Sequence, residues 1–291
     1  MLYIYIMPII FFPGQGTTAK ILDYQYINDK YENNDFVDQL RMISHVIIPE
    51  IPYNHVHYYE KSQIDSYKDM FKPIKNINFD DLFVENFIKN FYSTIDNQKK
   101  YIVIAHSDGI YFAMEFSRQY PQLVKHIISL DGSWITKELC QRRFDNWNKR
   151  GKNASIILSQ SELDDIFEKV KNETNNDIHI KKILDHTRFE HTEECINKKY
   201  ENIIKEIPFT VFRDFSSDIQ DHINAEFNKN ALDEHNILIK KSDKYQIFWL
   251  VDASHYIWFN KYYKKQIIKF VSNLVLIDKF IEKYRSINDF N

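Results

Sequence analysis

Glycine is the residue in shortest supply in this sequence, with five among 291 residues. An average composition would give about 20 glycines in a chain of this length. Where glycine is so scarce, we expect the remaining ones at places where the backbone cannot accept a side chain. The five are Gly14, Gly16, Gly109, Gly132 and Gly151. Their positions therefore indicate tight turns and close backbone approaches.

Three other shortages exclude classes of protein. Cys140 and Cys195 are too few for a disulfide framework and allow one bridge at most, so we expect a reducing, cytoplasmic setting. The net charge of −3 excludes the strongly basic surface of a dedicated nucleic-acid binder. No apolar run reaches the roughly 18 residues that a membrane span needs. Residues 1–12 are apolar but lack a basic start and a cleavage site, which favours a buried strand over a signal peptide.

Short apolar runs alternate along the chain with longer segments of helical periodicity. The runs are β-branched or aromatic and nearly continuous, as in strands that are buried on both faces. Strands are expected at residues 9–12, 45–48, 101–105, 127–130, 209–212 and 247–251. Helical spacing links Val84, Ile88, Phe91 and Ile95, then Ile110, Ala113 and Phe116, and finally Ile267, Phe270, Leu274, Ile277 and Ile281. This order predicts an α/β fold with a mainly parallel, doubly wound sheet.

One stretch interrupts the alternation. Residues 135–205 are polar, contain no convincing strand and have the pattern of several short helices. The strand pattern resumes at Ile207-Pro208. We therefore expect a core of residues 1–134 and 206–291, with residues 135–205 inserted as a helical cap.

The most informative segment is residues 101–110, YIVIAHSDGI. An apolar strand runs through a small–X–Ser–X–small sequence directly into a helical pattern. A nucleophile on such a tight turn needs small residues two positions before and after it, and Ala105 and Gly109 flank Ser107 in this way. The start of the following helix would direct free N–H groups towards a developing oxyanion.

With these residues the chain resembles the α/β-hydrolase family, and the match continues through residues 120–124 (YPQLV) and 127–132 (IISLDG). The resemblance implies a serine hydrolase that cleaves an ester, thioester or amide of a small acyl substrate through an acyl-enzyme, without metal or organic cofactor. Family members usually have one or two strands before the strand expected at residues 9–12. Eight residues precede it here, so we expect a shortened sheet whose exposed edge could pair with a second copy in a homodimer.

The loop after the first strand reads FFPGQGT at residues 11–17. In the family, the loop at this place supplies one N–H group of the oxyanion hole. By position, the resemblance assigns this role to the backbone of Gln15, between Gly14 and Gly16, together with the backbone of Asp108. Phe-Pro-Gly-Gln-Gly followed by His-Ser-X-Gly also resembles acyl-carrier-protein acyltransferases, which use the same kind of serine. An acyltransferase is therefore an alternative.

Ser107 needs a base, and His255 has the family's context, because it follows the last apolar run and a short loop and precedes a long helix. The resemblance places the acid at Asp218, in a segment similar to Arg-Gly-X-X-Ser-Asp in which Asp214 replaces the glycine. Asp218 would orient His255. Asp131 is the alternative acid, since some family members carry it after the earlier strand, and Asp214 ranks third.

Two further hypotheses are a metal centre and a protein without catalytic activity. The pairs His55 with His57 and His186 with His191 lack the further ligands of a metal centre, so no metal is expected. Ala105, Pro13 and Asp214 each depart from the commonest family pattern. They leave room for a catalytically silent protein that keeps the fold and binds a ligand.

Overall fold

A parallel sheet lies at the centre of the larger of two compact units into which the chain divides. In the computed structural model, the larger unit comprises residues 1–54, 94–133 and 203–291, and the second comprises residues 55–93 and 134–202. The structure describes residues 7–14, 24–27, 30–33, 35–49, 51, 81–107, 109–132, 201–215, 217, 222–253 and 256–288.

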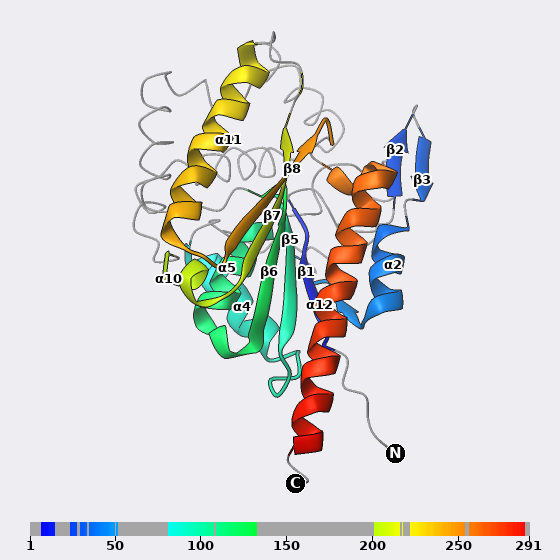
Figure 1. Cartoon of the computed structure of the whole chain (residues 1–291), viewed down its shortest axis with the longest axis vertical. Coiled ribbons are helices and arrows are strands. Elements are labelled where there is room, and N and C mark those ends of the chain that lie inside the picture. The colour runs from blue at the N-terminus through cyan, green and yellow to red at the C-terminus, as the bar shows by residue number, and fades with distance from the viewer. Residues whose placement is uncertain are drawn as a thin grey trace, which may run out of the picture. The chain divides into compact units, whose positions relative to one another are not determined.

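Six strands of the described residues form the sheet in the order β4-β1-β5-β6-β7-β8, and every neighbouring pair is parallel (Figure 1). The strands are β1 (Ile9–Phe12), β4 (Val46–Ile47), β5 (Tyr101–His106), β6 (Val124–Leu130), β7 (Phe209–Phe215) and β8 (Tyr245–Val251). Because the strands are parallel, their carboxyl ends meet at one edge of the sheet. That edge is where the candidate site lies.

Helices lie on both faces of this sheet, as the alternating pattern predicts (Figure 1). On one face, α2 (Phe36–Ile43) and α12 (Lys261–Asn288) pack over a core that includes Ile9, Phe11 and Trp258. On the other face lie α5 (Gly109–Gln119) and α11 (His222–Lys241), where the ring of His235 contacts Tyr245 and Trp249 of β8. The predicted α/β, doubly wound class is confirmed.

The strand predictions hold in position, but four of them fall short in length, and the one at residues 45–48 is too long, because β4 covers Val46–Ile47. β1 has the expected bounds, whereas β7 continues three residues beyond the expected end, to Phe215. A two-stranded antiparallel hairpin, β2 (Tyr24–Ile27) and β3 (Lys30–Asn33), was not expected. In α12 the expected apolar face is partly wrong: Ile277 is 55% exposed. The fully buried stripe consists of Ile267, Val271 and Val275.

In the second unit, the described element is α4 (Asp81–Tyr92). Its residues Val84, Ile88 and Phe91 are buried, as the helical spacing predicts, but the helix ends before Ile95. The expected cap lies outside the described residues except for residues 201–205, which begin α10 (Glu201–Glu206). The boundaries of the cap therefore stay a prediction.

None of the described helices is both long enough and apolar enough to cross a bilayer. The edges of the sheet are the two-residue strand β4 and the strand β8. The homodimer through a sheet edge stays a prediction.

Candidate active site

Three of the strands end in the same local conformation. Ser107, Asp131 and Asp252 directly follow β5, β6 and β8, and they have φ angles of 49°, 49° and 53°. This left-handed conformation costs a residue with a side chain about 1 kcal/mol or more. In each case the backbone N–H donates to a carbonyl oxygen of the neighbouring strand, at Leu130, Phe212 and Phe215 respectively. The chain therefore turns sharply at the carboxyl edge of the sheet while staying bonded to it.

Ser107 occupies the turn between β5 and α5. The strand before it is buried throughout, and α5 begins two residues later at Gly109. The N–H of Ile110 donates to the carbonyl oxygen of Ser107 at 3.2 Å, which closes the turn. A strand, one left-handed residue and a helix in this succession project a side chain beyond the edge of the sheet.

Gly109 and Gly14 allow the backbones around Ser107 to approach closely. A Cβ atom added to Gly109 would lie 2.2 Å from the carbonyl oxygen of Phe12. One added to Gly14 would lie 2.7 Å from Cβ of Ser107 and 2.8 Å from Nδ1 of His106. The loop that follows β1 therefore touches Ser107, and only glycine fits at these two positions.

Gly132 also lies at a close backbone approach, as the scarcity of glycine in the sequence predicts. A Cβ atom there would lie 2.9 Å from the carbonyl oxygen of Ser107 and 2.8 Å from Oγ of Ser129. The Ser129 hydroxyl donates to the carbonyl oxygen of Gly132 and accepts its N–H, at 3.0 and 3.2 Å. The end of β6 is thus folded against the turn that carries Ser107.

His106 links the strand before Ser107 to the segment that follows His255. Its side chain is 1% exposed, and its ring centroid lies 5.1 Å from that of Tyr256 and 4.6 Å from that of Trp258. Tyr256 is the next residue after His255, and Trp258 belongs to the short helix η3 (Ile257–Phe259). The neighbours of the predicted nucleophile and of the predicted base therefore contact each other.

Two carboxylates join the carboxyl-terminal part of β7, and Ser217 just beyond it, to the residues that follow β8. Oδ1 of Asp214 accepts the N–H of Ala253 at 2.7 Å. In the opposite direction, Asp252 accepts the N–H and the hydroxyl of Ser217 at 2.7 and 2.5 Å. These hydrogen bonds, the hydroxyl's foremost, hold the pKa of the Asp252 carboxyl below its ordinary value. The residues so joined include Ser217, which precedes Asp218 in the sequence, and Ala253, which lies two positions before His255.

Asp131, the alternative acid, is buried and engaged elsewhere. Its Oδ1 lies 3.2 Å from Nη1 of Arg213, and the side chains of both residues are at least 94% buried. The same nitrogen donates to the carbonyl oxygen of Asp131, and the N–H of Asp214 donates to Oδ1 at 3.2 Å. The carboxylate therefore anchors the carboxyl-terminal part of β7. Arg213 was not singled out from the sequence.

The remaining predicted site residues lie outside the described residues: Gln15, Gly16, Asp108, Asp218 and His255. The same holds for Cys140 and Cys195 and for the two histidine pairs. Within the part of the chain that is described, no three His, Cys, Asp or Glu residues are grouped so that they could hold a metal ion.

Similarity to solved structures identifies the fold. The chain is similar to an α/β hydrolase enzyme, MGS-M2, from a deep-sea metagenome library of the Medee basin, at 13% identity over 96% of this chain and 91% of that one, with a TM-score of 0.50. The chain has the α/β-hydrolase fold. A probable hydrolytic enzyme from Pseudomonas aeruginosa PAO1 matches at 10% identity over 90% and 84% of the two chains, with a TM-score of 0.52. MenH from S. aureus matches at 10% identity over 92% and 94%, with a TM-score of 0.51.

At this level of identity, the similarity establishes the α/β-hydrolase fold and nothing finer. Neither a family model nor a curated protein sequence matches the chain. The chemistry of this α/β-hydrolase fold must therefore be argued from its own residues.

Proposed function

We propose that this protein is a serine hydrolase in which Ser107 attacks the carbonyl carbon of a small acyl substrate. The observation that carries the proposal is the left-handed Ser107 at the turn from β5 to α5, with Gly14 and Gly109 pressed against that turn. Asp131 and Asp252 share the left-handed conformation, but Ser107 combines it with a buried strand before the turn and a helix that begins two residues later, as a nucleophile on a tight strand-to-helix turn does. The contact between His106 and Tyr256 supports a base at His255. The two cysteines in 291 residues support a cytoplasmic setting.

The proposed reaction has two steps. His255 removes the Ser107 proton as Oγ attacks, and then donates it to the leaving alcohol, thiol or amine, which gives an acyl-enzyme. Water, activated by His255, cleaves the acyl-enzyme and restores Ser107. Backbone N–H groups of Gln15 and Asp108 stabilise the oxyanion of each tetrahedral intermediate, and one such donor is worth about 3 kcal/mol in comparable sites. Asp218 holds the His255 ring and stabilises its charged form.

Turnover with three simple substrates tests this proposal: p-nitrophenyl acetate, an acetyl thioester and an acetyl anilide. Ser107→Ala and His255→Ala should each lower kcat by about a thousandfold or more on whichever substrate is cleaved. Ser93→Ala, at an exposed serine in a different part of the chain, should keep the wild-type rate. Binding of such acyl compounds without turnover by the wild type would favour the catalytically silent alternative. Transfer of the acyl group to an acceptor in preference to water would favour the acyltransferase.

The choice of acid needs a separate comparison. We expect Asp218→Asn to lower kcat strongly, because the His255 ring loses its orienting carboxylate. Asp131→Asn should lower the stability more than the rate constant, because Asp131 pairs with Arg213. The reverse result would make Asp131 the acid.

A further inference from the structure

The end of β7, with Ser217 just beyond it, is joined to the residues after β8 by side chains that cross in opposite directions. From the β7 side, the Asp214 carboxylate reaches the N–H of Ala253, and from the β8 side, the Asp252 carboxylate reaches Ser217. A third hydrogen bond continues the pairing of β7 with β8: the N–H of Asp252 donates to the carbonyl oxygen of Phe215. A single hydrogen bond would hold one side only. The two crossing contacts hold Ala253 to β7 and Ser217 to Asp252, so each side is fixed relative to the other.

The position of this pair along the chain is specific. Ser217 directly precedes Asp218, and Ala253 lies two residues before His255. Asp252 has a φ angle of 53°, so its backbone conformation is held against a local cost. The proposed reaction needs Asp218 and His255 in a fixed relative position. The crossing hydrogen bonds involve residues next to both of them in the sequence.

We propose that Asp214 and Asp252 form a latch that positions Asp218 against His255; this role rests on the proposed serine hydrolase function. Asp214 and Asp252 are positioning residues, since they act through the two loops and not on the substrate. Asp214 stands where the resembled family usually has glycine. A side chain at that position therefore adds a hydrogen bond that the glycine could not make.

The latch is anchored in the sheet. The N–H of Asp214 donates to Asp131, and Asp131 is paired with the buried Arg213. The polar contacts thus run without a break from the end of β6, through the end of β7, to the loop after β8. Hydrogen bonds to ionised acceptors are roughly twice as strong as neutral ones, which suits carboxylates to this task.

The rate of labelling by a fluorophosphonate, measured from pH 5 to 9 (about the range over which a histidine titrates), tests the latch. Asp214→Ala and Asp252→Ala should each lower the rate by about a hundredfold, the effect expected of a small misplacement of reacting groups. The midpoint of the pH profile should move to lower pH, because the His255 imidazolium loses the Asp218 carboxylate beside it. Asp214→Asn should be labelled clearly faster than Asp214→Ala, with a midpoint closer to that of the wild type, because its amide oxygen can still accept the N–H of Ala253, although more weakly than a carboxylate does.

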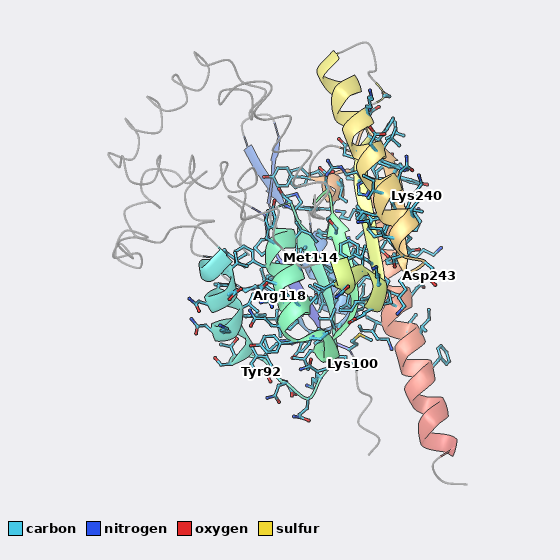
Figure 2. All side chains as sticks on the ribbon, turned by 90° about the vertical axis from the view of Figure 1, so that its left-hand side faces the viewer. Tyr92, Lys100, Met114, Arg118, Lys240 and Asp243 are labelled. Atoms are coloured by element: carbon cyan, nitrogen blue, oxygen red, sulfur yellow. The ribbon has the colours of Figure 1, made fainter. Side chains whose placement is uncertain are left out.

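The matched control is Asp243→Ala. Asp243 is an exposed aspartate near the amino end of β8, whereas Asp252 follows the carboxyl end of the same strand (Figure 2). Its rate and pH midpoint should equal those of the wild type. If Asp214→Ala does not fold, the exposed pair Asp252 and Ser217 carries the test: Asp252→Ala removes both hydrogen bonds from Ser217, whereas Ser217→Ala removes the hydroxyl's bond, keeps that of the N–H, and should therefore have the smaller effect.

The outcomes separate the two proposals. If the wild type is labelled and Asp214→Ala and Asp252→Ala match it in rate and midpoint, the latch is wrong and the serine hydrolase stands. An Asn variant at 214 as slow as the Ala variant also overturns the latch, because charge and not the hydrogen bond would then be required. Absence of labelling in the wild type would overturn the proposed function, and the positioning role with it.

Discussion

Strands β6, β7 and β8 are crossed by polar side chains at two levels, and the two levels differ in charge. Near the amino ends, Nε2 of His126 lies 2.7 Å from the Thr210 hydroxyl, which also accepts an N–H of Gln246 at 2.6 Å. At the carboxyl ends, the crossing groups are the carboxylates of Asp131 and Asp214 and the guanidinium of Arg213.

The difference between the levels follows from what each one bonds. The amino-end network joins side chain to side chain, from the buried His126 and Thr210 to the exposed Gln246, and burial lowers the pKa of His126 to about 4, so that its imidazole is neutral near pH 7. The carboxyl-end network contains the Asp131–Arg213 ion pair, and its carboxylates accept the backbone N–H groups of Asp214 and Ala253. Ionised acceptors hold these backbone groups more strongly than neutral ones would. Charge is therefore concentrated at the edge where we propose the chemistry.

Removing the cation of the carboxyl-end network should have the largest effect on stability. Arg213→Met leaves the buried Asp131 carboxylate without its ion-pair partner, which should lower the free energy of unfolding by about 3–5 kcal/mol. Urea unfolding measures this loss. Arg41→Met is the control, since Arg41 also pairs with an aspartate, Asp38, but both side chains are about half exposed, and this change should cost at most about 1 kcal/mol. Equal losses in the two variants would show that the Asp131–Arg213 pair is no stronger than a surface pair.

The neutral state of His126 in the amino-end network should make the stability depend on pH. In the unfolded chain His126 binds a proton below about pH 6.5, whereas in the folded protein it does so only near pH 4. The contribution of His126 is therefore complete above pH 6.5 and is lost as the pH falls towards 4, by about 3 kcal/mol in total. His126→Gln should lack this loss. The check is unfolding in urea at several pH values between 4 and 7, with His45→Gln, at an exposed histidine, as the control.

In that experiment the carboxylates titrate in wild type and variant alike, so their contribution cancels in the difference. Parallel curves for wild type and His126→Gln would contradict the neutral, buried state of His126. A His45→Gln curve that departs from the wild type would point to a general effect of losing a histidine.

A methyl group added at Gly109, at the carboxyl edge of the sheet, should have a smaller effect on stability. Alanine would favour a helix over glycine by about 1 kcal/mol at Gly109. The added methyl group, however, would overlap the carbonyl oxygen of Phe12, which is backbone and cannot move aside. Gly109→Ala should therefore lower stability by about 1–3 kcal/mol in net terms. Lys100→Ala, exposed just before β5 at the opposite edge (Figure 2), should change it by no more than about 0.5 kcal/mol. A stabilised Gly109→Ala protein would refute the close approach of α5 to β1.

The sequence predicts the sheet well because its strands are continuous apolar runs that need no knowledge of their neighbours. The end of β7 was predicted too early, since Arg213 and Asp214 are polar, and they extend the strand because partners on other loops satisfy them. Strands β2 and β3 pair with each other and not with the main sheet. Their sequences, YQYI and KYEN, are not continuous apolar runs, so the hairpin was not predicted.

The residues of the candidate site likewise fall into those that the sequence predicts and those that it does not. Ser107, Gly14 and Gly109 follow from local spacing, because a tight turn depends on residues two positions away. The contacts of Asp131, Asp214 and Ala253 join residues that are far apart in sequence, and they depend on the order β6-β7-β8. Asp214 in the place of a usual glycine was the available signal, but its partner could not be deduced without that order.

The most direct test of the central claim is the site of covalent modification by a fluorophosphonate, located by mass spectrometry of the digested protein. The account predicts one adduct per chain, on Ser107, in wild type and in Ser93→Ala, and none in Ser107→Ala. An adduct on another residue, or equal labelling of wild type and Ser107→Ala, would contradict it.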